Sequence, residues 1–201
     1  MGAFIVLEGR DASGKSTQAP LLVERLREVG RDVVETFEPG ATPAGAAIRA
    51  LLLDGDGPID PATEALLLAA DRAQEVADVI RPALARGADV VSDRFVPSSL
   101  AYQGVARELG VEAVEKLNRW ATGGLDPDLV VVLDVEDGVA RSRRAQPGDR
   151  LERAGARFHA AVRDAYRTLA PERGWVVVDG GADAGTVAER VWDVVRRRLG
   201  L

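Results

Sequence analysis

Nine consecutive residues near the N-terminus have the types and spacing of a phosphate-binding loop. Residues 9–17 follow the apolar run 4–7 and read G-R-D-A-S-G-K-S-T, which fits the pattern G-x-x-x-x-G-K-[ST]. In such a loop, backbone N–H groups and the positive end of the next helix, expected over about 15–29, face the phosphate oxygens. Lys15 would bring a cation to the β- and γ-phosphates, and the Ser16 hydroxyl would bind Mg²⁺. The residues predicted to bind nucleotide phosphates are Gly9, Arg10, Asp11, Ala12, Ser13, Gly14, Lys15, Ser16 and Thr17.

A second signal is an acidic residue at the end of an apolar stretch. Asp93 comes directly after residues 89–92, which read D-V-V-S, and Arg94 follows it. A carboxylate in this place, next to a phosphate-binding loop, lies close to the Mg²⁺ of the nucleotide. We therefore predict that Ser16 and Asp93 bind the metal, directly or through water. Arg94 would suit a second phosphate held bidentately, with a surface ion pair as the alternative.

Arginines gather at a third place. Arg141, Arg143, Arg144 and Arg150 surround the helix-breaking sequence Q-P-G at 146–148. In most proteins such a group is a solvated helix face. A phosphate-transfer enzyme, however, needs cations that close over the transferring group and exclude water. A short arginine-rich lid over about 141–152 would supply them, and one such arginine can contribute roughly 10³–10⁵ in rate.

The elements that must position these residues follow from the apolar pattern. Valine-rich runs predict strands at 3–8, 32–36, 89–92, 129–135 and 175–179, with helical stretches between them. Such runs are typical of a parallel sheet buried on both faces. Proline after a capping residue at 42–43 and 60–61 predicts two helix starts, and Pro82 could interrupt the second helix. We predict an α/β fold with a five-stranded parallel sheet flanked by helices, and residues 1–201 as a single domain.

Composition limits the partners and the location. The net charge of −6 makes a nucleic-acid polymer or an anionic membrane an unexpected partner. The absence of cysteine and of a signal-peptide pattern fits a cytoplasmic protein, and no stretch has the length of a membrane span. The single histidine, His159, cannot belong to a multi-histidine metal site and is expected on a helix surface.

Further segments match the patterns of one family. Residues 93–104 read D-R-F-V-P-S-S-L-A-Y-Q-G, similar to D-R-[YF]-x-x-S-x-x-A-Y-Q-G, and 66–74 read L-L-L-A-A-D-R-A-Q, similar to L-L-F-x-A-D-R-A-Q. Shorter matches are E-P-G at 38–40, I-R-A-L-L-L at 48–53 and D-R-L-E at 149–152. Over nearly its whole length the chain therefore resembles the bacterial thymidylate kinases, which transfer the γ-phosphoryl group of ATP to dTMP. This resemblance implies a P-loop nucleoside-monophosphate-kinase fold, ATP as donor and Mg²⁺ as cofactor.

The resemblance also implies roles around the acceptor phosphate. Asp11 would lie near the sugar 3′-hydroxyl and that phosphate, which Arg49 and Arg94 would hold. Family members carry a catalytic arginine either just after this aspartate or in the lid, and here Ala12 follows Asp11. The chain is thus of the lid-arginine type. No general base is assigned, because transfer between polyanions needs cations, Mg²⁺ and in-line positioning. The predicted catalytic residues are Lys15, Arg94, Arg141, Arg143 and Arg144.

On the side of the base, Arg72 and Gln103 would read the pyrimidine edge and Tyr102 would pack against the deoxyribose. Leu68 replaces the aromatic residue that stacks on the base in the family, and Phe37 replaces an arginine. Stacking is worth roughly 1–3 kcal/mol. Phe37 either takes over part of this apolar wall or fills the core. The implied acceptor-binding residues are Asp11, Phe37, Arg49, Leu68, Arg72, Arg94, Ser98, Ser99, Tyr102 and Gln103.

Alternatives from two classes stay open at this stage. One is a kinase for another or modified pyrimidine nucleotide, or a nucleoside kinase, although the latter would not need two arginines directed at an acceptor phosphate. The other is a non-enzymatic nucleotide switch, but the two lysines, Lys15 and Lys116, exclude the N-K-x-D motif of guanine readers. The resemblance also implies a homodimer packed through helices, for which 64–86 and 100–120 are the expected surfaces.

Overall fold

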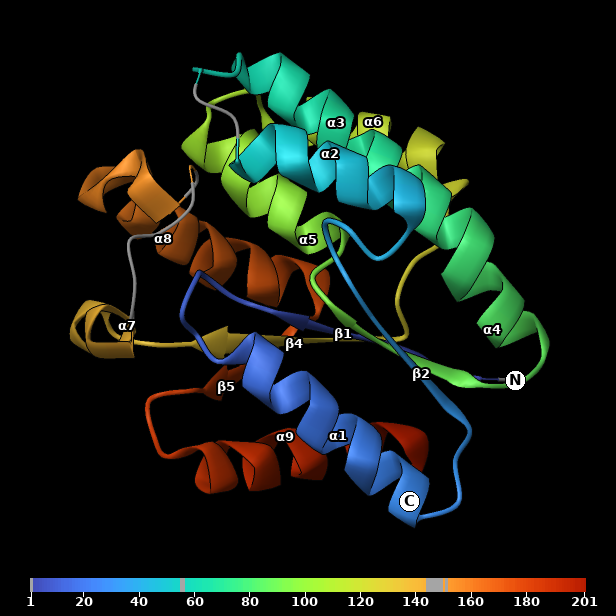
Figure 1. The fold of residues 1–201 in the computed structure, drawn as a ribbon. Coiled ribbons are helices and arrows are strands. Elements are labelled where there is room, and N and C mark those ends of the chain that lie inside the picture. The colour runs from blue at the N-terminus through green and yellow to red at the C-terminus, as the bar shows by residue number, and fades with distance from the viewer. Residues whose placement is uncertain (1, 55–56, 144–149, 151) are drawn as a thin grey trace.

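The valine-rich runs pair into one parallel sheet, in the order β2-β3-β1-β4-β5 (Figure 1). The structure is a computed structural model that describes residues 2–54, 57–143, 150 and 152–201. The five predicted strands are confirmed, with bounds that differ by at most one residue at either end. The strands are β1 (Phe4–Glu8), β2 (Val33–Phe37), β3 (Asp89–Asp93), β4 (Leu129–Asp134) and β5 (Val176–Asp179).

The order of the strands decides where a ligand can bind. The chain leaves β1 towards β2 and β3 on one side and later adds β4 and β5 on the other. Ligands of open α/β sheets bind outside the carboxyl ends of the strands at such a reversal. Leu7 of β1 and Phe37 of β2 both pair with Asp93 of β3, so that the phosphate loop, Asp93 and the residues after β2 meet at one edge.

Helices cover both faces of the sheet, as Figure 1 shows. On one face, α1 (Lys15–Glu28) and α9 (Ala184–Leu199) enclose an aliphatic core with inward residues of the strands. On the other face, the core is partly aromatic and includes Phe4, Phe95, Tyr102 and Tyr166. Between β2 and β3 the chain forms α2 (Pro43–Leu53), α3 (Pro61–Glu75) and α4 (Arg81–Ala85). Between β3 and β4 it forms α5 (Val96–Ser99) and α6 (Val111–Thr122), and between β4 and β5 it forms α7 (Asp137–Arg143), a short 3₁₀ turn at Glu152–Ala154 and α8 (Ala156–Arg173).

The predicted helix starts are confirmed by their caps. The Thr42 hydroxyl accepts a hydrogen bond from the N–H of Gly45, and the Asp60 carboxylate accepts from Ala62. The long helix from Pro61 changes to π-helical geometry at Val76–Ile80, directly before α4, which contains Pro82. A second π-helical segment, Leu100–Ala106, carries Tyr102 and Gln103.

One expectation about the surface was wrong. His159 lies on α8 as expected for a helix, but only 4% of it is exposed, and its ring meets Phe158 edge to face. The amphipathic pattern of α8 does not reveal that this helix is covered on a second side by the 100–106 segment. Among the described helices, none is long and apolar enough to cross a membrane.

Candidate active site

A cavity of about 640 Å³ lies at the carboxyl ends of β1, β2 and β3. All ten residues predicted to bind the acceptor line it, together with Lys15, Ser16 and Asp93. In the sequence these residues are as far apart as Asp11 and Gln103, and the order of the strands brings them to one edge of the sheet. The structure thus gathers these side chains in one place, while their roles stay predictions.

The phosphate loop has a backbone that requires glycine. Gly9 has φ 134° and Gly14 has φ 102°, a region that side chains disfavour. A Cβ on Gly9 would also lie 2.8 Å from the Ser13 hydroxyl oxygen. Lys15 folds over the loop, and its ammonium donates to the carbonyls of Gly9 and Arg10 at 3.0 Å each. Burial and the nearby Arg94 lower the pKa of Lys15 to about 8.

The predicted metal ligands lie side by side. The Ser16 hydroxyl donates to Asp93 Oδ2 at 2.9 Å, and Ser16 itself is exposed. The other oxygen of that carboxylate, Oδ1, is buried and has no hydrogen-bond partner within the described residues. Hard oxygen ligands with unused lone pairs are what Mg²⁺ prefers, so these two residues fit the ion.

Arg94 joins the phosphate loop to the cavity wall. Its guanidinium forms an ion pair with Asp11 and donates to the Ser98 hydroxyl at 2.9 Å. Tyr102 completes the cluster, because its hydroxyl donates to Asp11 at 3.0 Å and its ring lies 5.1 Å below the Arg94 guanidinium. Burial alone would raise the pKa of Asp11, but Arg94 and Lys15 outweigh it and lower the pKa below its ordinary value.

Arg94 also has a strained backbone, with φ 79°. Such strain is typical of functional positions that the surrounding structure holds in place. Here Glu8, fully buried at the end of β1, accepts from the N–H groups of Phe95 and Ser98 at 2.9 and 3.1 Å. Tyr166 donates to the same carboxylate at 2.7 Å. Glu8 therefore fixes the turn that aims Arg94 at the cavity.

The far end of the cavity contains a second arginine in a different state. Arg72 is 1% exposed, and its N–H groups are taken up by Glu38, Ser99, Asn118 and the Phe95 carbonyl. The bond to the Ser99 hydroxyl measures 3.0 Å. To read a base edge, as predicted, Arg72 would have to exchange one of these acceptors.

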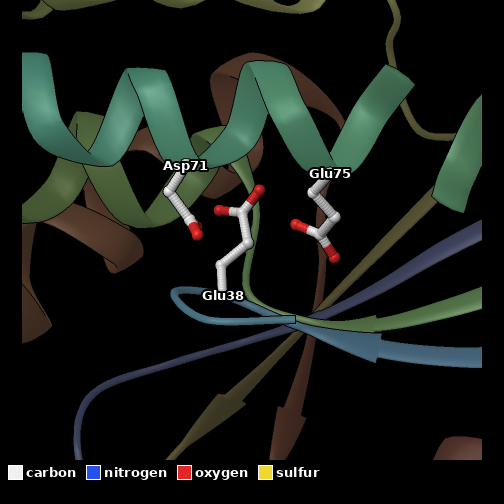
Figure 2. Close-up of side chains that lie close together, drawn as sticks. All are labelled: Glu38, Asp71 and Glu75. Atoms are coloured by element: carbon white, nitrogen blue, oxygen red, sulfur yellow. The ribbon is translucent and has the colours of Figure 1, made fainter. Parts of the chain in front are cut away.

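Glu38, the partner of Arg72, belongs to a cluster of three carboxyl groups with Asp71 and Glu75. Figure 2 shows Asp71 and Glu75 of α3 pointing towards Glu38, which follows β2. One oxygen of each lies within 4.8 Å of the others. Burial raises the pKa of all three groups, that of Glu75 to about 7. Burial disfavours the charged form of a carboxyl group, which is why the pKa rises in each case.

The remaining acceptor residues differ in burial. Arg49 of α2 is exposed and donates to the Pro39 carbonyl at 2.7 Å. Leu68 is buried against Leu52 and Leu53. Phe37 is 47% exposed and lines the cavity, so it does not fill the core.

Of the predicted lid arginines, Arg143 alone among those described contacts the phosphate loop. It donates to the Ala182 carbonyl at 2.8 Å and more weakly to the Ser13 carbonyl at 3.4 Å. Arg141 is exposed on α7. Arg144 lies outside the described residues. Arg10, included among the phosphate-binding residues, points its buried side chain to Asp137 of α7 and lies outside the cavity.

Sequence reasoning missed the carboxylates that support this site, Glu38 and Glu64. Glu64 is fully buried and accepts from Gln103 at 2.8 Å. Helical spacing was the available signal, because Glu64, Leu68 and Arg72 follow one another at four-residue intervals and so share a face of α3.

Comparisons with known proteins agree over nearly the whole chain. A family model described as thymidylate kinase matches residues 7–191. The thymidylate kinase of Halothermothrix orenii is 46% identical over 200 residues, 97% of this chain and 97% of the relative. Those of Synechococcus sp. (strain JA-3-3Ab) and Leifsonia xyli subsp. xyli are 49% identical over 201 residues (98% and 96% covered) and 48% over 194 residues (94% and 92% covered).

Proposed function

The chain belongs to the thymidylate kinase family, and from this premise we propose how its own residues divide the work of the reaction. The protein transfers the γ-phosphoryl group of ATP to dTMP and forms dTDP, which supplies dTTP for DNA synthesis. A new bond joins the γ-phosphorus to an oxygen of the dTMP phosphate, while the bond to the β–γ bridging oxygen breaks and ADP leaves. The observation that carries the assignment of roles is the single cavity that holds all ten predicted acceptor residues next to Lys15 and Ser16.

The donor half of the site is the phosphate loop. Its backbone N–H groups and the ammonium of Lys15 bind the β- and γ-phosphates of ATP. Ser16 and Asp93 hold Mg²⁺, which when bound neutralises charge between the phosphates. The support for this assignment is the Asp93 carboxylate, whose Oδ2 accepts from the Ser16 hydroxyl while its buried Oδ1 has no hydrogen-bond partner among the residues that the structure describes.

The acceptor half binds the dTMP phosphate through Arg94 and Arg49. Arg94 is preorganised by Ser98 and Asp11, and Arg49 is free to move because it is exposed and bonded to one carbonyl. With Arg94 held in place and Arg49 moving onto the bound phosphate, the acceptor oxygen faces the γ-phosphorus in line, and the transfer needs no general base.

The base lies at the far end, between Leu68, Phe37 and the polar groups of Arg72 and Gln103. Gln103 Oε1 is buried without a partner in the described part of the chain, and it accepts the N3–H of the pyrimidine. The pyrimidine O4 takes the place of the Ser99 hydroxyl as an acceptor for Arg72. Phe37 supplies part of the apolar wall that the leucine at 68 leaves incomplete.

The lid spans about 141–152, and Arg143 is its catalytic arginine. Both Arg141 and Arg143 are exposed on α7, but Arg143 donates to the carbonyl of Ser13 inside the phosphate loop and to the Ala182 carbonyl. We expect Arg143→Ala to lower kcat by roughly 10³ or more. Arg141→Ala is the matched control, and an equal loss in both variants would contradict the choice of Arg143.

The experiment that tests the whole proposal is a coupled ADP-release assay with ATP and Mg²⁺ across dTMP, dUMP, dCMP and thymidine. We expect the highest kcat/KM with dTMP and none with thymidine, which lacks the phosphate that Arg49 and Arg94 bind. Absence of turnover with every pyrimidine monophosphate would overturn the function, and a preference for another nucleotide would favour a modified specificity.

The whole chain is proposed to act as one kinase domain in a cytoplasmic homodimer. Support for the dimer comes from Leu66 of α3, 58% exposed, and Trp120 of α6, 83% exposed, on two helices that pack together. Exposed large apolar side chains on adjacent elements mark interaction surfaces. Sedimentation of the wild type and of Trp120→Glu tests the dimer, and cell fractionation tests the location.

A further inference from the structure

Glu64 is a buried carboxylate that the proposed reaction does not use. It lies on α3 with no exposed surface, and it is not among the residues that line the cavity. Its two oxygens accept hydrogen bonds from Gln103 and Arg107, at the 100–106 segment and its C-terminal end, and from the distant Arg150. Gln103 Nε2 and Arg107 Nε donate to Oε1 at 2.8 and 3.2 Å, and Arg107 Nη2 and Arg150 Nη2 donate to Oε2 at 3.1 and 2.9 Å.

The charge on Glu64 decides how Gln103 is oriented. Beside two guanidinium groups Glu64 is a carboxylate, which has acceptors and no donor. Only the nitrogen of the Gln103 amide can therefore face it. The amide oxygen, Oε1, is then the atom that does not face Glu64. It is buried and has no hydrogen-bond partner within the described residues. Because Gln103 lines the cavity, the atom that it offers to a ligand is this oxygen, a hydrogen-bond acceptor.

We propose that Glu64 is a positioning residue for base selection, which fixes the Gln103 amide so that the cavity presents an acceptor to position 3 of the pyrimidine. Thymine and uracil carry an N–H at this position and can donate to Oε1. Cytosine carries a lone pair there, which would face a second acceptor and leave both unsatisfied. The inference rests on the proposed placement of the base beside Gln103.

The test compares dTMP, dCMP and dUMP in the wild type and in Glu64→Gln. Glutamine at 64 can donate to Gln103 Oε1, so the Gln103 amide can turn and offer N–H to the cavity. We expect the ratio of kcat/KM for dTMP over dCMP to fall about ten- to hundredfold. The ratio for dTMP over dUMP should stay unchanged, because both bases carry the same N3–H.

Ratios of this kind do not depend on how much of the enzyme is folded, because the active concentration cancels. Arg107→Met is the matched control, since it removes ion pairs to Glu64 but leaves the carboxylate facing Gln103. It should lower the melting temperature without changing the ratio of dTMP to dCMP. An unchanged ratio in Glu64→Gln, or an equal fall in both variants, would overturn the role of Glu64.

If Glu64→Gln does not fold, NMR of the wild type gives a second measurement. The side-chain amide protons of Gln103, assigned with Gln103→Met, should include one that exchanges slowly and keeps its shift when dTMP binds. Rapid exchange of both protons would overturn the proposal. If the wild type fails to phosphorylate dTMP, the proposed function fails instead, and the amide measurement still tests the contact with Glu64.

Discussion

Two arginines that line the cavity, Arg72 and Arg49, are held in opposite ways. At the base end, Arg72 is 1% exposed and donates to Glu38 and three other acceptors. At the phosphate end, Arg49 is exposed and, within the described residues, donates to one carbonyl. A guanidinium whose donors are all occupied is held in one orientation, whereas one with few bonds can change partners when a phosphate arrives. Arg94 resembles Arg72 in this respect, because Asp11, Ser98, Tyr102 and the Gly9 carbonyl all accept from it. Arg72 and Arg94 are therefore held in place, and Arg49 is the arginine that is suited to exchange.

The largest effect on stability should come from replacing Arg72. Arg72→Ala leaves Glu38 buried without its cation, and removing one partner of a buried ion pair costs about 3–5 kcal/mol. Urea unfolding measures this loss. Arg49→Ala at the other end should change stability by no more than about 0.5 kcal/mol but raise KM for dTMP. If both variants lose the same free energy of unfolding, the contrast between Arg72 and Arg49 is wrong.

A loss of similar size, but in rate, is expected from the phosphate loop. Lys15→Ala removes a cation directed at the transferring group and should lower kcat roughly 10²–10³-fold. The melting temperature should not fall, because the buried ammonium donates only to carbonyls of the loop. The chain offers a matched control in its other lysine, since Lys116 is exposed and paired with Glu112. An equal fall in kcat for Lys116→Ala would mean that the loss in Lys15→Ala reflects the net charge of the protein and not the position of Lys15.

A smaller effect should come from the apolar wall. Phe37→Ala removes an aromatic ring that lines the cavity, and we expect KM for dTMP to rise roughly tenfold with kcat little changed. Leu51→Ala, on an exposed position of α2 outside the cavity, is the control. Equal KM values for Phe37→Ala and the wild type would mean that the ring does not contact the base.

The smallest effect concerns the carboxyl cluster behind Arg72. Burial raises the pKa of Glu75 from 4.5 to about 7, so between these values the folded protein binds a proton that the unfolded chain releases. This contribution to stability is fully present below about pH 4.5 and is lost as the pH rises through about 7. Glu75→Gln removes the titration and should be more stable than the wild type above pH 7, by on the order of 1 kcal/mol.

The comparison is made by thermal melting between pH 5 and 9, where the two curves should converge at the acid end. Because Glu75 also contributes to the raised pKa of Glu38, the difference between the curves reports the titration of Glu75 together with its effect on Glu38. Glu24→Gln, at an exposed position of α1, serves as control. Parallel curves for Glu75→Gln and the wild type would contradict a raised pKa for Glu75.

Local patterns predicted the fold and most of the cavity residues. The strands were found because buried parallel strands are continuous apolar runs, and the helix starts because their caps are local hydrogen bonds. What the sequence did not reveal were the buried charges. Glu64 and Arg150 are 86 residues apart, and Glu38 and Arg72 are 34 apart. Motifs pointed to Glu38, Arg72 and Arg150, but neither the pairing of these charges nor the burial of Glu64 shows in the local sequence.

The sequence by itself determined the chemistry of the phosphate loop, because its nine residues are contiguous and their backbone makes the binding surface. The family also followed from the sequence, because its motifs are contiguous stretches of the chain. Only the tertiary structure decided which charges are buried and which exchange partners. Burial depends on how α3, the π-helical segment 100–106 and the edge of the sheet pack around Arg72 and Glu64. This packing brings together residues that are far apart in the sequence, so no local pattern reveals it.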